Sequence, residues 1–131
     1  MSAFSDSEQL YRVMLSLWQR IKENPEMSQK LLASGLIVRF NYKEPDGVIT
    51  IYCSDKVNMR VYADKCEVKP IVEMDMKSDF AHSFWLGQEN VAMAMLQGKF
   101  TSKGPMQRAL ALLPCVQPAF KIYPQVRQEV G

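Results

Sequence analysis

An alternation of apolar side chains at every second position of residues 36–53 constrains the fold of this chain more than any other feature. The apolar positions are Leu36, Val38, Phe40 and Tyr42, and then Ile49, Ile51 and Cys53. Between these two runs, residues 44–47 (EPDG) supply the proline, aspartate and glycine of a tight turn. Because successive side chains of a strand point to opposite faces of a sheet, this pattern predicts a β-hairpin.

Two further segments continue the same period. Residues 59–63 are apolar at every second position, and residues 72–77 alternate Val72, Met74 and Met76 with Glu73, Asp75 and Lys77. Pro70 precedes the second segment, where a strand start tolerates proline. Such regular alternation predicts a sheet with one face on a core and a wetter opposite face, on which Glu73 and Asp75 are simply solvated.

Helical periodicity precedes the hairpin. Residues 7–23 carry one apolar stripe, formed by Leu10, Val13, Met14, Leu17, Trp18 and Ile21. This spacing predicts an amphipathic helix on the core. Asn24 and Pro25 fit the cap and first position of a second helix, which would run to Ser34 and stop at Gly35.

After residue 77 the predicted elements are short. We expect a helix from about residue 79 to Leu86, an apolar helix over residues 91–97, a strand over 99–103 and a helix over 106–113. Gly87, Gly98, Gly104 and Pro114 would end these four elements in turn. Residues 115–124 (CVQPAFKIYP) contain two more prolines and are predicted to be turn-rich. Helices, then strands, then helices predict an α+β fold.

Composition limits the architecture and the partners. A chain of 131 residues that is 47% hydrophobic and 23% charged has the size and character of one globular domain, and no linker divides it. Its net charge of +2 is spread along the chain, so we expect no nucleic-acid partner. Three cysteines without paired spacing favour free thiols over disulfides or a zinc site. With no recognisable signal peptide or membrane span, a cytoplasmic location is the expectation.

The sequence offers no convincing catalytic constellation. His82, the single histidine, lies near Asp79 and Ser83, but all three belong to about one helical turn and cannot converge as a hydrolytic triad. No nucleophile elbow, phosphate-binding loop, dinucleotide fingerprint or metal-ligand spacing is present. We therefore expect no catalysis, no cofactor and no metal.

Residues 79–114 carry a family likeness. The matching positions are Asp79-Phe80, Gly87, Ala94-Met95-Leu96, Gly98-Lys99, Gly104 and Ala109-Leu110. With the hairpin and strands before it, this order of glycines around apolar helices resembles the sterol carrier protein 2 family. The likeness covers about residues 30–123 of a single domain spanning 1–131, so the helix at 7–23 lies outside it.

This resemblance implies a mixed, mainly antiparallel five-stranded sheet, covered on one face by helices, with an apolar tunnel between the layers. Family members bind sterols, fatty acids, acyl chains and phospholipids and have no catalytic residues of their own. Some small bacterial members assist quinone synthesis by holding prenylated intermediates.

The resemblance also suggests why residues 91–96 (VAMAML) contain no polar side chain, although a surface helix normally keeps a wet face. A helix between a sheet and an apolar cavity would meet no water on either side, and unbranched methionines adapt to ligands of varied shape. We expect the following residues to bind the ligand: Met74, Met76, Phe84, Trp85, Val91, Met93, Met95, Leu96, Leu110 and Leu113.

The predicted function is that of a non-enzymatic carrier holding one hydrophobic molecule, such as a fatty acid, an acyl chain, a sterol-like lipid or a prenyl lipid. Two alternatives remain open: an accessory factor that presents quinone-biosynthesis intermediates to enzymes, and an interaction domain with a filled core. Transient contact with a membrane and protein partners in lipid or quinone metabolism are further expectations.

Overall fold

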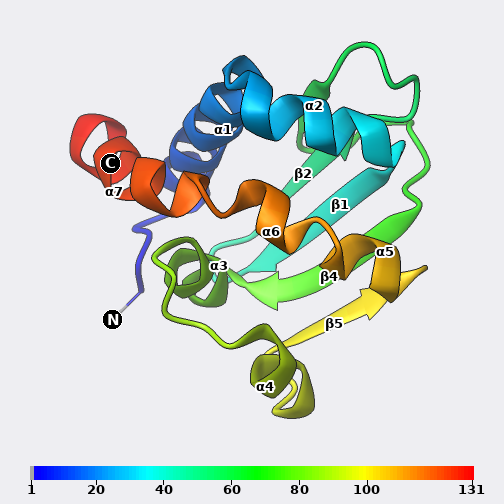
Figure 1. Ribbon diagram of the computed structural model, residues 1–131. Coiled ribbons are helices and arrows are strands. Elements are labelled where there is room, and N and C mark those ends of the chain that lie inside the picture. The colour runs from blue at the N-terminus through cyan, green and yellow to red at the C-terminus, as the bar shows by residue number, and fades with distance from the viewer. Residues whose placement is uncertain (1) are drawn as a thin grey trace.

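The computed structural model describes residues 2–131 as one sheet with a layer of helices on one face (Figure 1). In chain order the elements are α1 (Ser7–Glu23), α2 (Pro25–Ser34), β1 (Ile37–Lys43), β2 (Gly47–Tyr52), β3 (Arg60–Ala63), β4 (Val72–Lys77), α3 (Ser78–Trp85), α4 (Val91–Leu96), β5 (Phe100–Lys103), α5 (Met106–Leu110), α6 (Leu113–Val116) and α7 (Ala119–Val130).

The sheet is mixed and mainly antiparallel, as the sequence led us to expect. Its strand order is β3-β2-β1-β4-β5, with β1 and β4 parallel and the other pairs antiparallel. The predicted hairpin is confirmed, since Phe40 pairs with Ile49 in antiparallel register. The parallel pairing of Phe40 with Met74 then places apolar side chains of three adjacent strands on one face.

The opposite face of the sheet is polar and partly covered by the segment between β3 and β4. Arg39 reaches this segment through a hydrogen bond of 2.6 Å from Nη2 to the carbonyl oxygen of Val68, and its Nε donates to Thr50 Oγ1 at 3.1 Å. Beside it, Asn41 Nδ2 donates to Glu73 at 2.9 Å and to Asp75 at 2.7 Å. These bonds hold three neighbouring strands together and leave the inner face free to be apolar.

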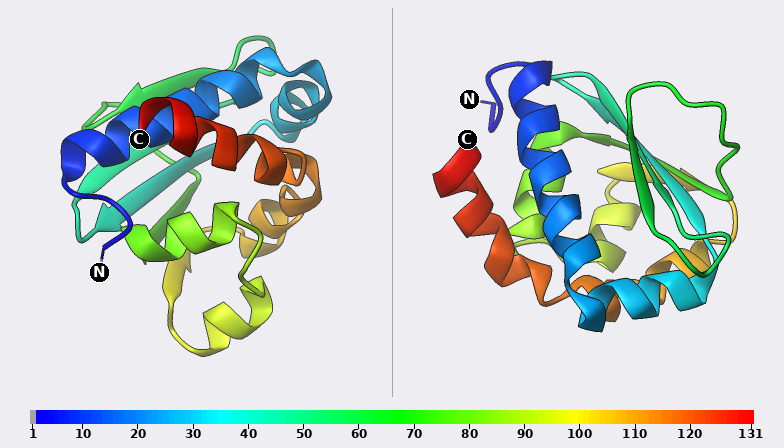
Figure 2. Two further views of the ribbon diagram at one scale, coloured as in Figure 1. Left: turned by 90° about the vertical axis from the view of Figure 1, so that its left-hand side faces the viewer. Right: turned by 90° about the horizontal axis from the view of Figure 1, so that it is seen from above.

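The helical layer is anchored by α1. Asp6 caps this helix, because its carboxylate accepts a 2.8 Å hydrogen bond from the backbone N–H of Gln9. The predicted stripe is confirmed, since all six of its members are buried. Figure 2 shows α7 lying alongside α1, so these two helices pack against each other within the helical layer.

The C-terminal region differs from the sequence expectation. The predicted helix over 106–113 ends at Leu110, and Pro114 lies in the first turn of α6 instead of ending a helix. The segment predicted to be turn-rich runs largely through the 12-residue helix α7, which contains Pro124. Proline costs a hydrogen bond inside a helix, but Tyr123 and Val126 are fully buried in the main core cluster together with α1. Tertiary packing therefore outweighs local preference.

Within residues 2–131, no helix has both the length and the hydrophobicity required to cross a bilayer.

Candidate functional site

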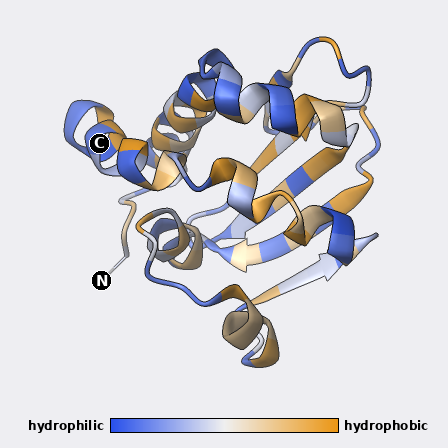
Figure 3. Cartoon of the chain, viewed as in Figure 1, coloured by the Kyte–Doolittle hydropathy of each residue, from blue (hydrophilic) through white to orange (hydrophobic). Residues whose placement is uncertain are grey.

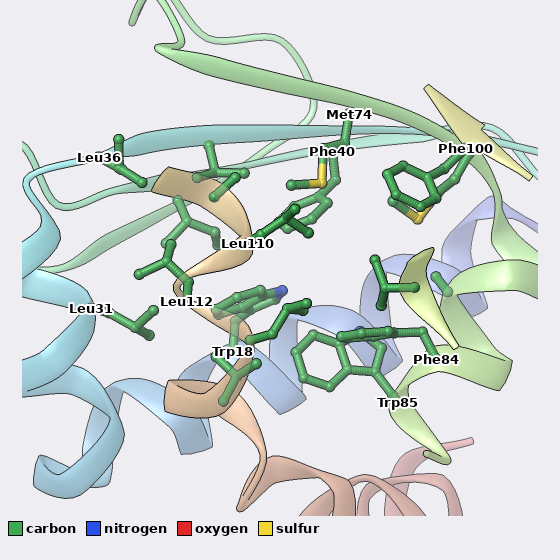
Figure 4. A pocket seen from close by; sticks show the side chains of 18 of the residues that line it. Trp18, Leu31, Leu36, Phe40, Met74, Phe84, Trp85, Phe100, Leu110 and Leu112 are labelled. Carbon is green, nitrogen blue, oxygen red and sulfur yellow. The ribbon is translucent and has the colours of Figure 1, made fainter. Parts of the chain in front are cut away.

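An apolar cavity of about 110 Å³ lies between the inner face of the sheet and the helices (Figure 4). Its sheet wall consists of Val38, Phe40, Tyr42, Ile51, Met74, Met76 and Phe100. These side chains share one face because they occupy alternate positions of adjacent strands in the observed registers.

The helical wall draws on six helices that are far apart in the sequence. Its large members are Trp18 from α1, Leu31 from α2, Phe80, Phe84 and Trp85 from α3, Val91 from α4, Met106 and Leu110 from α5, Leu112 from the short connection, and Leu113 and Val116 from α6. No single segment forms the cavity, so the complete fold is needed to build it.

Aromatic rings support the cavity at its centre. Trp18 meets Trp85 edge to face, with ring centroids 5.7 Å apart, and lies 5.9 Å from Phe40. Trp85 also contacts Phe84 at 5.0 Å. Such pairs prefer defined offset or perpendicular geometries, so this cluster holds the helical wall at a fixed position over the sheet.

The cavity wall carries no charged residue among the part of the chain that the structure describes. Its two acidic groups remain neutral near pH 7: burial raises the pKa of Cys53 to about 11 and also raises the pKa of Tyr42 well above its usual value. Because desolvation penalises the charged forms, the wall offers hydrocarbon, aromatic and sulfur surface to whatever enters.

A second, more open hollow of about 280 Å³ adjoins this cavity. Phe84, Val91 and Leu113 line both spaces, so these three side chains separate the cavity from the hollow. The remaining wall of the hollow includes Glu89 and Gln117, which makes it more polar than the cavity. The residues shared by the two spaces therefore come from α3, α4 and α6.

The structure places seven of the ten predicted ligand-binding residues in the wall of the cavity: Met74, Met76, Phe84, Trp85, Val91, Leu110 and Leu113. The other three, Met93, Met95 and Leu96, are exposed to 50%, 40% and 83%. Ligand binding by any of the ten remains a prediction.

The expectation that the helix 91–96 is buried on two sides is wrong. In α4 only Ala94 is buried, and Figure 3 shows this largely apolar helix at the edge of the molecule beside β5. A segment of fewer than two turns that is apolar all round gives no indication of which side meets protein. The helix ends as predicted near Gly98, where the N–H of Lys99 donates to the carbonyl oxygen of Ala94 at 2.9 Å.

Several wall residues, above all Trp18, were not predicted from the sequence. This residue stands on the predicted apolar stripe of α1, but the family likeness begins beyond that helix. Phe40, Tyr42 and Phe100 were likewise expected on strands without being assigned to a site. A large aromatic at an inward position of each element was the available signal.

The side chain of His82 pairs with that of Tyr123. Its Nδ1 lies 2.7 Å from the hydroxyl of Tyr123, while the Oδ1 of Asp79 accepts a hydrogen bond from the N–H of Ala3 at 2.7 Å. Asp79 lies in the first turn of α3, and Lys77 occupies the cap position of this helix without a side-chain hydrogen bond. Partial burial and the positive charge of Arg127 lower the pKa of His82, against an opposing effect of Asp79.

This lowered pKa predicts how stability depends on pH. Below about pH 6.5, the usual pKa of histidine, the unfolded chain binds a proton more readily than the folded chain. The contribution of His82 to stability is therefore present at neutral pH and lost as the pH falls through its folded pKa. Since His82 is the single histidine, one-dimensional proton NMR can follow its ring directly. A folded pKa above that of the urea-unfolded chain would contradict the prediction, and His82→Gln should flatten the pH profile of urea unfolding.

The comparisons with known proteins agree with this architecture. The profile of the SCP-2 sterol transfer family matches residues 16–116. No curated protein matches the sequence. Among solved structures, sterol carrier protein 2 from Yarrowia lipolytica in its apo form is 14% identical, with a TM-score of 0.63, covering 82% of this chain and 87% of that chain.

Two other solved structures share the same fold. A ubiquinone synthesis protein, UbiJ-SCP2, is 10% identical with a TM-score of 0.62, covering 90% of this chain and 96% of that chain. Palmitated SCP2L2 from Aedes aegypti is 14% identical with a TM-score of 0.51, covering 86% of this chain and 92% of that chain.

Proposed function

The chain belongs to the SCP-2 sterol transfer family, and from that membership we propose that it carries one lipid molecule in the apolar cavity without chemically altering it. The observation that supports this proposal most directly is the cavity itself, which lies between the sheet and the helices and has no charged wall residue among residues 2–131. Transfer of each methylene from water to such a space contributes about 0.8 kcal/mol. Long apolar chains would therefore bind without many hydrogen bonds.

The cavity must enlarge to hold a complete lipid. An engineered protein cavity of about 150 Å³ binds no more than a molecule the size of benzene. The cavity here, at about 110 Å³, is smaller still. Flexible side chains of Met74, Met76 and Met106 lie in the wall and can adopt other rotamers. We propose that these methionines and the short helices α4 and α5 shift outward as the lipid enters, which would produce the tunnel expected of the family.

Native mass spectrometry of protein purified without detergent tests the carrier function. We expect a bound lipid at one copy per chain, or uptake of one copy from offered fatty acids, sterols or prenyl lipids, with extraction identifying the molecule. A protein that stays free of lipid under all these conditions would contradict the proposal and favour an interaction domain.

A role as an accessory factor in quinone biosynthesis is a second candidate. It is supported by the fold shared with UbiJ-SCP2, since the structural match covers 90% of this chain and 96% of that chain. This role also depends on the cavity, but the lipid would be a prenylated ring and the protein would meet biosynthetic enzymes. Extraction of such an intermediate, together with copurification of those enzymes, would distinguish it from a general carrier.

We further propose that α4 touches the membrane when lipid enters or leaves. Met93, Met95 and Leu96 are exposed, while Val91 at the start of the same helix lines the cavity. An apolar helix that joins a cavity wall to the surface could pass a lipid between bilayer and interior without exposing it to water. This would account for an apolar helix that protein does not cover.

Replacement of Leu96 by glutamate tests this contact. Burying a large aliphatic side chain contributes about 1.5–3 kcal/mol, so Leu96→Glu should slow transfer of a fluorescent lipid between vesicles by about tenfold or more. Equilibrium binding of a soluble fluorescent neutral lipid should remain unchanged. Val57→Glu is the matched control, since Val57 is 80% exposed on the β2–β3 connection. Equal transfer rates for the two variants would contradict membrane contact through α4.

A further inference from the structure

Trp18 presents an unused hydrogen-bond donor at the cavity. Its indole Nε1 is the single buried side-chain nitrogen or oxygen without a partner among residues 2–131. The residue is 4% exposed and belongs to the cavity wall. In Figure 4 the nitrogen lies on the side of the indole that faces the space between the rings of Phe40 and Trp85.

A buried donor without a partner is unfavourable, and buried polar groups are nearly always satisfied. The neighbouring rings offer only aromatic faces, which are weak acceptors. The wall contains two hydroxyl-bearing residues, Ser34 and Tyr42, and neither is a partner of the indole. The Ser34 Oγ already donates to the carbonyl oxygen of Leu31 and accepts from the N–H of Leu36. A buried water molecule needs about two to four polar partners, which this apolar wall does not provide.

Building on the proposed carrier function, we propose that the indole N–H of Trp18 binds an uncharged oxygen acceptor of the cargo, of the carbonyl class. A ketone, an ester or a quinone ring has such an oxygen on an otherwise apolar body. A carboxylate does not fit here, because the wall contains no positive charge to offset the cost of burying an anion. The cargo is therefore a neutral lipid whose carbonyl lies against α1, with apolar parts on either side.

The rigid setting of Trp18 suits this role. The residue belongs to a 17-residue helix whose stripe is fully packed, and its ring is held by Phe40 and Trp85. A donor on such a support keeps its direction when the cavity enlarges, whereas α4 and α5 are short enough to move. The same donor would thus select the cargo and fix its depth in the cavity.

A binding cycle with two ligands and two variants separates the N–H from the ring. The probes are pentadecan-8-one and pentadecane, measured by displacement of a fluorescent lipid. Trp18→Phe keeps an aromatic ring and removes the donor. We expect it to weaken ketone binding by about tenfold more than alkane binding, since one satisfied buried donor has about this effect. Comparing the two ligands cancels the effect of the smaller ring.

Trp85→Phe is the matched control, because Trp85 lines the same cavity and contacts Trp18. It should change ketone and alkane binding by the same factor. If Trp18→Phe also changes both by the same factor, the inference is overturned while the carrier function stands. If neither the fluorescent lipid nor either probe binds the wild-type protein, the proposed function fails as well.

Nitrogen-15 NMR provides a readout on the wild-type protein, for which a variant is needed only to assign the signals. The chain has two tryptophans, so two indole signals appear, and Trp85→Phe assigns them. The Trp18 indole proton should move downfield when the ketone binds and not when the alkane binds. Methyl tetradecanoate and 2-decyl-1,4-benzoquinone then identify whether an ester or a quinone is the source of the oxygen. An indole signal that is indifferent to all three carbonyl ligands would overturn the inference.

Discussion

Leu110→Asp is expected to weaken lipid binding by at least about 100-fold, because a carboxylate would face the hydrocarbon of the cargo. Leu110 lies in the wall of the cavity on α5 and is half-buried, so an aspartate there can reach water while the cavity is empty. The fold should therefore survive. Titration with a fluorescent neutral lipid and with the cargo identified by extraction measures the effect.

The matched control for this prediction is Ala111→Asp. Ala111 is the next residue of the chain and is exposed. The substitution Ala111→Asp adds the same charge at the C-cap of α5, and Ala111 does not line the cavity. We expect it to bind lipid as the wild-type protein does, with the same circular dichroism spectrum as Leu110→Asp. Binding by Leu110→Asp within threefold of the control would show that lipid does not occupy the cavity near α5.

Gly104→Ala is expected to lower the free energy of unfolding by about 3–5 kcal/mol. Gly104 has φ +104°, and a Cβ atom there would lie 2.2 Å from the carbonyl oxygen of Ile71. That oxygen belongs to backbone just before β4, so it cannot move without disturbing the pairing of β4 with β5. The loss would be a large fraction of the roughly 5–15 kcal/mol that stabilises a typical domain.

Gly98→Ala separates the clash from the backbone conformation. Gly98 also has positive φ, +73°, but nothing lies within 4 Å of a Cβ built there. Only the conformational cost applies, about 1–2 kcal/mol. Urea unfolding of both variants measures the difference, and a cost for Gly104→Ala no larger than that for Gly98→Ala would contradict the steric explanation.

Local chemistry determined the elements that the sequence predicted well. The hairpin and the second helix follow from side-chain alternation, the turn at 44–47, Asn24 as a cap and Gly35 in a left-handed conformation. Each of these features acts over a few residues and needs no knowledge of the rest of the chain. The order of helices and strands extended the prediction to an α+β fold, and the family likeness added the five-stranded mixed sheet.

Tertiary packing determined what the sequence did not predict. The helix α7 forms despite Pro124 because it packs against α1, whereas α4 has only Ala94 buried. The cavity needs inward side chains from six helices and four strands at once, so no local pattern could place Trp18 beside Phe40. Seven of the ten predicted ligand-binding residues do line the cavity, because large apolar side chains are frequent on the inner faces of a fold. The exposed Leu96 shows the limit of that reasoning, since an apolar side chain alone does not reveal which way it faces.

The packing of α7 on α1 has one more consequence, for the path of the chain as a whole. Gln9 donates to the carbonyl oxygen of Gly131, Arg12 to that of Val130, and Arg127 to that of Ala3. The C-terminus is thus bound to α1 and the N-terminal segment to α7, and both ends lie on the same side of the molecule (Figure 1). A flexible linker along this side of the molecule could therefore join the two ends of the described chain. New termini could then be opened at an exposed turn, giving a circular permutant with the same sheet and the same interior.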